Sequence, residues 1–343
     1  MNWNNNMHKT IAVLGAGKFG TAVANLIAPN ANHVLLYTNK AEHAFLSELG
    51  RSCAGQVLAN NIKVTDDLTD ILASCSIIFP VVPAAKFRSL MQQIAPKLTP
   101  EHVLIHGTKG LDLSECQEGE SLCRRHIATM SEVIAQETAV QTIGCLAGPN
   151  LSTDLAKQQP ASTVVASSSA KALAIGKYFL TNSWFRVYPS MDLLSVEFCS
   201  VLKNIFAIGA GMLAGSAYGD NTYAFFLTMS IAELQHIMCT IGISPSAILG
   251  PAGIGDLIAT CGSSSSRNYT IGYRLARGEK ITDILAGTHE VSEGVQTVKT
   301  IYQLMQSYGI RTPITDVIYR ILFKELPIKT GISYLMRYTT KGV

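Results

Sequence analysis

A short glycine-rich segment near the start of the chain has the spacing that holds a dinucleotide. The apolar run Ile11–Leu14 is followed by glycines at positions 15, 17 and 20, and then by a helix-like, alanine-rich stretch to Ala28. Gly15 permits a tight turn, Gly17 lets the backbone approach a pyrophosphate, and Gly20 lets the helix pack close to the strand. Free N–H groups at the helix N-terminus would bind the anion. A tight turn without a ligand can carry the same glycines, but the position between an apolar strand and a helix favours a dinucleotide site.

The residues after the second expected strand, His33–Tyr37, indicate which nicotinamide cofactor would bind. An Asp or Glu there would hold the ribose hydroxyls of NAD. This chain instead has Thr38, Asn39 and Lys40, and the first carboxylate after the strand is that of Glu42. An amide and a lysine tolerate a 2′-phosphate and can attract it. The sequence therefore predicts NADPH as the preferred cofactor, with NADH also possible.

A lysine interrupts the most apolar stretch in the second half of the chain. Lys203 and Asn204 lie within a run of largely apolar residues from Val196 to Ala217. Removing an ammonium group from water costs free energy unless the group is paired or functional, and burial moves a lysine pKa toward the range useful for proton transfer. A lysine at a helix edge can also extend its ammonium into water. The residues alone leave both interpretations open.

Two further polar segments have the composition of ligand-binding loops. Lys109 follows the expected strand His102–His106, and ligands of open α/β sheets bind outside that edge of the strands. The segment from Gly255 to Asn268 ends in Ser-Arg-Asn ahead of an expected helix, and arginine suits a phosphate geometrically. A solvated loop lysine and a capped helix start are the simpler explanations, and the second of these can coexist with binding.

These residues are expected to lie in an α/β domain followed by a helical domain. The first half alternates apolar strand-like runs with helix-like segments, which is typical of a parallel sheet covered on both faces. The expected strands are Ile11–Leu14, His33–Tyr37, Ser76–Val82, His102–His106, Gln141–Leu146, Ser162–Ala166 and Phe185–Tyr188. The expected helices among them are Gly20–Ala28, Ala84–Leu98, Glu120–Gln136 and Ala170–Leu180. We predict a Rossmann-type doubly wound sheet over residues 10–189, an all-helical substrate and catalytic domain over residues 190–343, and a disordered tail over residues 1–9.

The composition argues against several other classes of protein. A chain of 343 residues with 48% hydrophobic residues suits two folded domains. The net charge of +3, without a run of like charges, gives no indication of nucleic acid or an anionic membrane as a partner. The longest apolar stretch, Ile205–Ala217, is shorter than the roughly 20 residues of a membrane span. Because the polar segment Met1–Lys9 also lacks a signal-peptide pattern, we expect a cytoplasmic protein without membrane insertion.

The cysteines give no sign of a metal or redox motif. All eight are scattered singly, and no two form a C-x-x-C pair. Zinc and redox motifs need closely spaced ligands, so we expect free thiols in a reducing compartment and no metal site.

Eight short motifs, taken in order, resemble the bacterial-type NAD(P)-dependent glycerol-3-phosphate dehydrogenases over nearly the whole chain from Thr10. They are G-A-G-x-x-G-T-A from Gly15, F-P-V-V-P from Phe79, T-K-G-L from Thr108, A-G-P from Ala147, L-K-N from Leu202, G-D-L from Gly255, S-R-N from Ser266 and E-G-V from Glu293. The resemblance implies a two-domain fold similar to 6-phosphogluconate dehydrogenase. It also implies a homodimer that interconverts dihydroxyacetone phosphate and sn-glycerol 3-phosphate for glycerophospholipid synthesis.

The resemblance implies roles for individual residues. Lys203 would be the catalytic acid/base and would contact the substrate, and Lys109 would contact both cofactor and substrate. The other implied cofactor contacts, beside Asn39 and Lys40, are Gly15, Gly17, Lys18, Phe19, Gly20, Ser152, Arg267, Val291 and Glu293. The other implied substrate contacts are Gly148, Asn150, Asp256, Ser266, Arg267 and Asn268.

The chain departs from the family pattern at a few positions. Asn150 stands where Ser or Thr is usual, and Leu151-Ser152 stands where Phe-Ala is usual. Lys18-Phe19 replaces a common Ser-Trp or Ser-Tyr pair. Pro80 is unusual inside a strand and is expected at a strand end or a bulge. These departures concern individual contacts and leave the implied activity unchanged.

The implied reaction assigns a task to each group. Lys203 would protonate the developing alkoxide, and Asp256 would keep the lysine ammonium in place and charged. Arg267 with Asn268 would anchor the phosphate, while Lys109 would add positive charge near the carbonyl oxygen or the nicotinamide. Two alternatives stay open. One is a two-domain dehydrogenase acting on another hydroxy acid or on 6-phosphogluconate, and the other is a non-enzymatic NADP(H)-sensing protein.

Overall fold

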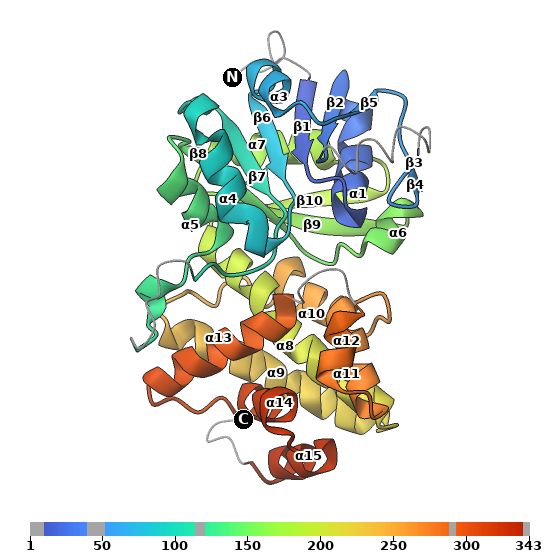
Figure 1. Ribbon diagram of the computed structural model, residues 1–343, viewed down its shortest axis with the longest axis vertical. Coiled ribbons are helices and arrows are strands. Elements are labelled where there is room, and N and C mark those ends of the chain that lie inside the picture. Colours follow the sequence, from blue (N-terminus) through green and yellow to red (C-terminus); the bar gives the residue numbers. More distant parts are fainter. Residues whose placement is uncertain (1–9, 40–51, 114–120, 288–292, 339–343) are drawn as a thin grey trace. The chain divides into compact units, whose positions relative to one another are not determined.

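A computed structural model describes residues 10–39, 52–113, 121–287 and 293–338 of the chain (Figure 1). The chain divides into two compact units. The first comprises Met1–Asp112 and Ala128–Val196, and the second comprises Leu113–Ile127 and Glu197–Val343. The division at residue 196 lies inside a long helix, α8 (Leu193–Gly215).

The first unit is built on an eight-stranded sheet in the order β10-β9-β8-β7-β6-β1-β2-β5. Its strands are β1 (Thr10–Leu14), β2 (His33–Tyr37), β5 (Ile62–Thr65), β6 (Ile77–Pro80), β7 (Val103–His106), β8 (Thr142–Ala147), β9 (Ala161–Ala166) and β10 (Phe185–Ser190). All seven expected strands are present, and β5 is an eighth that the sequence did not predict. Pro80 ends β6, as expected for a residue that cannot donate to the ladder.

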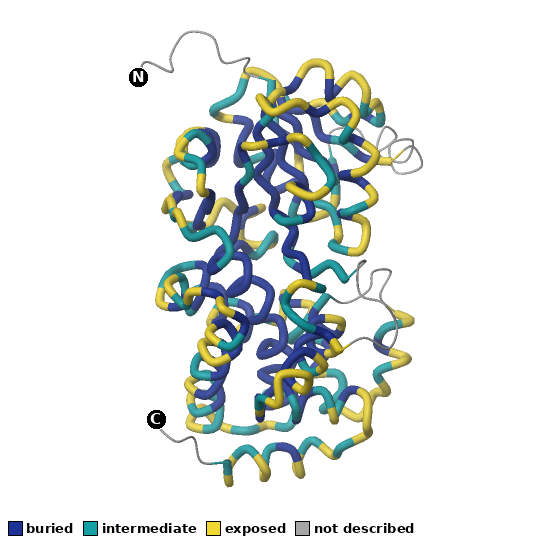
Figure 2. Tube along the Cα trace, turned by 90° about the vertical axis from the view of Figure 1, so that its left-hand side faces the viewer, coloured by how far each residue is buried: buried dark blue, intermediate teal, exposed yellow. Residues whose placement is uncertain are grey.

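Helices cover both faces of this sheet. They are α1 (Lys18–Ile27), α3 (Leu68–Ser74), α4 (Ala84–Ile94), α5 (Met130–Glu137), α6 (Ser152–Ala156) and α7 (Ala170–Leu180). On one face Val13 and Phe79 belong to a buried cluster with residues of α1 and α7. On the other face Leu14 and Ile78 belong to a cluster with residues of α3, α4 and α5. Because successive strand residues enter different clusters, the central strands β1, β6, β7 and β8 are almost entirely buried (Figure 2), and the predicted doubly wound sheet is confirmed.

Helices α3 and α6 were not predicted from the sequence, and two further details of the first half differ from expectation. Strands β8 and β9 are antiparallel, so β9 starts at the edge of the sheet where β8 ends, and the connection between them contains only the five-residue helix α6. Parallel neighbours need a crossover that returns the chain along the sheet, and this connection makes none. The expected helix over 120–136 is wrong in its first half, where the described residues hold only a short 3-10 turn, Arg124–His126. The helix α5 begins at Met130, where Thr129 and Glu132 form a capping box.

The described part of the second unit from Glu197 onward is helical, as predicted. Its elements are α8, α9 (Asp220–Thr240), the π-helix η4 (Pro251–Gly255), α10 (Asp256–Cys261), α11 (Arg267–Ala276), α12 (Ile281–Ala286), α13 (Glu293–Ser307), α14 (Pro313–Lys324) and α15 (Ile328–Arg337). Among the described residues, α8 is the one helix long and apolar enough to cross a membrane, which corrects the shorter apolar stretch expected from the sequence. Its most apolar window is 89% buried inside the protein, as in the core helix of a folded domain.

Helices α8 and α11 approach each other backbone to backbone. A Cβ atom added at Gly211 would lie 1.9 Å from the carbonyl oxygen of Tyr269, and one added at Gly215 would lie 2.6 Å from that of Tyr273. The contacts advance in the same direction along both helices, so the first residues of α11 lie toward the N-terminal end of α8, on the side of Gly211 where Lys203 lies. The glycine series thus sets the position of the α11 N-terminus relative to that lysine.

Candidate active site

The glycine turn of the first unit is shaped by contacts that leave no room for side chains. Gly15 has a φ of +122°, and a Cβ there would lie 2.4 Å from the carbonyl oxygen of Val81. A Cβ at Gly20 would lie 1.8 Å from the carbonyl oxygen of Gly15. Gly17, by contrast, has nothing within 4 Å of an added Cβ and precedes the first turn of α1. The open space in front of these helix N–H groups fits the pyrophosphate of a dinucleotide.

A small hairpin that the sequence did not predict braces this turn. It consists of β3 (Ser52–Cys53) and β4 (Gln56–Val57). The buried thiol of Cys53 donates a 3.3 Å hydrogen bond to the carbonyl oxygen of Ala16. Gln56 Nε2 donates over 2.7 Å to the carbonyl oxygen of Lys18. The hairpin thus holds the carbonyl groups of Ala16 and Lys18. The free N–H groups at the start of α1 stay directed toward the place where the pyrophosphate is expected.

At the end of β2 the expected ribose-binding residues meet a neighbouring strand. Thr38 is buried, and its N–H donates a 3.0 Å hydrogen bond to the carbonyl oxygen of Thr65 at the end of β5. Asn39 is exposed, and Lys40 lies outside the described residues. Burial raises the pKa of Tyr37, and the carboxylate of Asp66 raises it further. The carboxylate of Asp66, directly after β5, is therefore close to the end of β2, although the residues directly after β2, Thr38 and Asn39, carry no carboxylate.

The 107–112 loop after β7 places Lys109 beside Gly148. Its start is held by a 2.9 Å hydrogen bond from Gly107 N–H to the carbonyl oxygen of Pro80. A Cβ at Gly107 would lie 3.0 Å from the ring of Phe19, so this loop adjoins the glycine turn. Lys109 Nζ donates a long hydrogen bond of 3.4 Å to the carbonyl oxygen of Gly148. The first unit thus brings its glycine turn, Lys109 and Gly148 to one edge of the sheet.

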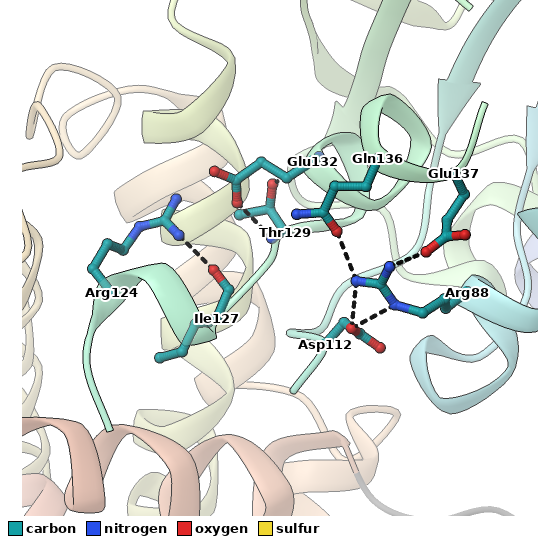
Figure 3. Close-up of polar contacts among 8 residues, drawn as sticks. All are labelled: Arg88, Asp112, Arg124, Ile127, Thr129, Glu132, Gln136 and Glu137. Carbon is teal, nitrogen blue, oxygen red and sulfur yellow. Dashed lines mark hydrogen bonds and ion pairs between the residues drawn. The ribbon is translucent and has the colours of Figure 1, made fainter. Parts of the chain in front are cut away.

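The same loop ends at Asp112, where a network of polar groups holds it (Figure 3). Arg88 of α4 donates from Nε to Asp112 Oδ2 over 2.8 Å, and its Nη2 lies 2.8 Å from the same oxygen. Arg88 also pairs with Glu137 and donates over 2.7 Å to Gln136 Oε1. Asp112 and Ala128 exchange backbone hydrogen bonds of 2.8 and 3.0 Å. The loop is therefore fixed at both ends.

Asn150 provides an acceptor close to Gly148. Its Nδ2 donates over 2.8 Å to Thr163 Oγ1, which in turn donates over 3.0 Å to the carbonyl oxygen of Ala147. The Asn150 Oδ1 atom is buried and has no hydrogen-bond partner in the protein. A donor of a bound substrate would satisfy it. Ser152, another departure from the family pattern, is half-buried at the first position of α6.

In the second unit Lys203 is buried in an ion pair. Its Nζ lies 3.1 Å from Asp256 Oδ1, and both side chains are at most 5% exposed. The same Nζ donates over 2.5 Å to Thr260 Oγ1, which donates over 3.1 Å to Asp256 Oδ1. A snorkelling lysine at a helix edge is excluded, because this ammonium is paired inside the fold. Thr260 was not predicted as a site residue, although it follows Asp256 at the i+4 spacing that puts two side chains on one helix face.

Local structure explains how Asp256 reaches this position. The π-helix η4 ends directly before α10, and a Cβ at Gly253 would lie 2.2 Å from the carbonyl oxygen of Ile248. Short π-helical turns of this kind re-aim side chains and are frequent at functional sites. Burial raises the pKa of the neighbouring thiol of Cys261 to about 12, against the opposing effect of the nearby Lys203 ammonium. Cys261 is therefore a protonated, inert neighbour of the cluster.

The predicted phosphate site lies at the N-terminus of α11. Ser266 caps that helix, and its hydroxyl accepts a 3.3 Å hydrogen bond from Tyr269 N–H. Arg267 is exposed at the first helical position. A Cβ at Gly294 would lie 2.2 Å from Asn268 Oδ1, so Asn268 lies against the first turn of α13, which begins at Glu293. Val291, also predicted near the cofactor, lies outside the described residues.

The described residues contain no group of three or more His, Cys, Asp or Glu side chains that could hold a metal ion. The polar groups of the two units instead suit a dinucleotide, a phosphate and a proton donor.

Comparison with known proteins identifies the family. The model of the N-terminal domain of NAD-dependent glycerol-3-phosphate dehydrogenase matches residues 10–173, and the model of its C-terminal domain matches residues 192–333. The chain belongs to the NAD-dependent glycerol-3-phosphate dehydrogenase family.

Relatives within the family match the chain along nearly its full length. A glycerol-3-phosphate dehydrogenase [NAD(P)+] of Teredinibacter turnerae is 34% identical over 330 residues, which cover 95% of this chain and 94% of the relative. One from Lacticaseibacillus paracasei is 36% identical, with coverage of 98% and 96%. The crystal structure of glycerol-3-phosphate dehydrogenase from Coxiella burnetii superposes with a TM-score of 0.86 at 28% identity, covering 96% of this chain and 99% of that one. The family and the fold implied by the eight motifs are therefore confirmed.

Proposed function

We propose that this glycerol-3-phosphate dehydrogenase family member interconverts dihydroxyacetone phosphate and sn-glycerol 3-phosphate by hydride transfer with NAD(P)H. The observation that carries the proposal is the buried Lys203–Asp256–Thr260 cluster. A buried, charge-paired ammonium suits the protonation of an alkoxide. The N-terminus of α11, which lies toward the same end of α8, suits a phosphate. Alternatives acting on other hydroxy acids, and a non-enzymatic NADP(H) sensor, do not account for the family membership and this cluster together.

In this proposal the chain's own residues move the proton and orient the substrate. The nicotinamide, when bound, supplies the hydride to the carbonyl carbon. Lys203 donates a proton to the carbonyl oxygen as that oxygen gains negative charge. Asp256 keeps the ammonium charged before the step and favours its reprotonation afterwards, because an opposite charge stabilises the protonated lysine. Thr260 bridges the two groups and fixes the direction in which the lysine points.

The substrate phosphate is anchored by Arg267 and Asn268 at the start of α11. The free N–H groups of the first turn add to the positive potential there. Binding energy from the phosphate orients the reacting carbonyl, so truncated substrates should lose turnover as well as affinity. We assign Asn150 and Gly148 to substrate contacts, and Lys109 to contacts with both substrate and cofactor.

We also propose NADPH as the preferred cofactor. The proposal rests on Asn39 and Lys40 after β2, where an acidic residue would favour NAD. Lys18, Phe19, Ser152, Val291 and Glu293 complete the proposed cofactor contacts. Steady-state kinetics with each nicotinamide tests this, and a clear preference for NADH would refute it.

The decisive experiment follows absorbance at the nicotinamide band with dihydroxyacetone phosphate as substrate. Lys203→Ala should bind NADPH normally but lose turnover by roughly 10²- to 10⁴-fold, as is typical of an acid–base group. Lys299→Ala removes an exposed lysine of the same unit and serves as the matched control. Near-normal turnover of Lys203→Ala would refute the assignment of the proton donor.

The family resemblance supports three further proposals about the setting of the reaction. These are a cytoplasmic location, a homodimer, and the supply of sn-glycerol 3-phosphate for glycerophospholipid synthesis. Within each subunit, residues 10–189 would bind the cofactor and residues 190–343 would carry the catalytic lysine and the phosphate anchor. Sedimentation velocity of the purified chain tests the dimer directly.

A further inference from the structure

The residues that directly follow β2 and β5 lie side by side, because the pairing of these strands continues to their carboxyl ends. Tyr37 pairs with Thr65 in parallel register, and Thr38 N–H donates a 3.0 Å hydrogen bond to the carbonyl oxygen of Thr65. Neighbouring strands are about 4.8 Å apart. Asp66, the residue after Thr65, is therefore placed next to the segment that begins at Thr38.

Three carboxylates follow β5, and their surroundings distinguish them. Asp67 caps α3, because its Oδ1 accepts hydrogen bonds of 2.9 and 3.0 Å from Thr69 and Asp70 N–H groups. Asp70 is exposed in the first turn of that helix. Asp66 is half-buried, and its charge reaches the phenol of Tyr37 on β2, whose pKa it raises together with burial. Of the three, Asp66 is the carboxylate whose charge acts on Tyr37 at the end of β2.

The strand order places this carboxylate beside the adenosine half of the cofactor. The pyrophosphate is expected at the glycine turn after β1, and the ribose at the end of β2. Gly15 N–H donates over 3.1 Å to the carbonyl oxygen of Tyr37, so the turn and the end of β2 adjoin. In the order β6-β1-β2-β5, the next element beyond the ribose is the end of β5.

We propose that Asp66 is a specificity-determining residue for the cofactor, whose carboxylate accepts a hydrogen bond from the ribose 2′-hydroxyl and repels a 2′-phosphate. This inference rests on the proposed binding of the cofactor at the glycine turn. Asp66 supplies, from a neighbouring strand, the acidic group that β2 itself lacks. This effect runs against the NADPH preference predicted from the residue types after β2, and it keeps NADH usable beside NADPH.

Equilibrium binding of two adenosine fragments to the full chain tests the proposal without any reaction. Adenosine 2′,5′-bisphosphate carries the 2′-phosphate and 5′-AMP does not, and calorimetry gives the Kd of each. In Asp66→Asn the preference for the bisphosphate should rise about tenfold, because a like charge within several ångströms is removed. The effect should be larger at low salt, since salt screens exposed charges.

Asp70→Asn is the matched control, because it removes an exposed carboxylate of the same segment from the first turn of α3. It should leave the ratio of the two Kd values within about twofold of wild type. Asp66→Ser is a second variant of smaller volume, which should repeat the shift if Asp66→Asn is poorly folded. An unchanged ratio in both Asp66 variants would overturn the proposal. Equal weakening of both fragments would also overturn it, since that result places Asp66 at the adenine.

The same experiment separates this inference from the proposed NADPH preference. The wild-type ratio of the two Kd values, with the kinetics of NADPH and NADH, tests the preference itself. The change of that ratio in Asp66→Asn tests the role of Asp66. A wild-type preference for NADH would refute the former and leave the latter standing, whereas failure of both fragments to bind would refute the cofactor position on which both depend.

Discussion

Glu233, on α9, carries a buried carboxylate that we expect to make the second unit less stable as the pH rises. Its Oε2 accepts a 2.7 Å hydrogen bond from Ile314 N–H, and its Oε1 accepts from the N–H and the hydroxyl of Thr315 over 2.8 and 2.6 Å. Burial raises the pKa of Glu233 from 4.5 to about 7, although these three donors at the start of α14 act in the opposite direction.

The size and direction of the effect follow from linkage between proton binding and folding. A carboxyl whose pKa is raised in the folded state holds its proton more tightly there than in the unfolded chain. Its contribution to stability is therefore complete below pH 4.5 and is lost as the pH rises through about 7. The difference between these two pKa values corresponds to about 3.4 kcal/mol at 1.36 kcal/mol per pKa unit. Roughly 2.5 kcal/mol of this falls between pH 5 and 8.

Glu233→Gln removes the titration and keeps the shape of the side chain. Its amide has a single acceptor oxygen, so it loses at least one of the three hydrogen bonds, at a cost of about 1–3 kcal/mol at every pH. Urea unfolding of both proteins between pH 5 and 8 measures the free energy of unfolding. The advantage of wild type over Glu233→Gln should shrink by roughly 2.5 kcal/mol across that range. The exposed Glu325→Gln should show no such trend, and a pH-independent difference for Glu233→Gln would refute the reasoning.

Three further predictions concern the second unit. Thr260→Val should lower turnover by about tenfold and move the pH dependence of kcat, because the hydroxyl that orients the catalytic lysine is lost. Thr260→Ser, which keeps the hydroxyl, should restore both. An unchanged pH profile in Thr260→Val would show that the hydroxyl has only a packing role. Arg267→Ala should chiefly raise the KM for dihydroxyacetone phosphate, by roughly 10- to 100-fold for a lost charged contact. The control Arg277→Ala, at the other end of α11, should leave the KM unchanged. An unchanged KM in Arg267→Ala would show that Arg267 does not anchor the phosphate. Gly211→Ala should destabilise the protein by about 2 kcal/mol or more, because its Cβ would lie 1.9 Å from the carbonyl oxygen of Tyr269. Gly219→Ala should be tolerated, because an added Cβ there has nothing within 4 Å. Thermal unfolding of both variants measures the difference.

Features that depend on neighbouring residues in the chain could be predicted from the sequence. The glycine turn is an example, because strand, turn and helix follow one another directly and each glycine answers a local steric demand. The start of α5 was predictable as well, since Thr129 and Glu132 have the spacing of a capping box, but the preceding polar residues were included in the helix. The pairing of Lys203 with Asp256 was predicted from the family resemblance and is confirmed, but α8 alone does not predict it, because both partners of the lysine, Asp256 and Thr260, lie on α10, far along the chain.

The end of β2 shows why a local interpretation of the cofactor site is incomplete. A rule that searches the residues after Tyr37 for an acid finds Asn39 and Lys40 and predicts NADPH. The hydrogen bond from Thr38 to Thr65 brings in a second strand that the sequence did not predict, and with it the carboxylate of Asp66. The ribose is exposed to the charged side chains that follow every strand ending beside it. Cofactor preference therefore depends on which strands are neighbours in the sheet as well as on the residues after β2. The comparison of Asp66→Asn with Asp70→Asn measures the contribution of Asp66, because both variants remove one charge from the same segment and Asp66 is the one that acts on Tyr37 at the end of β2.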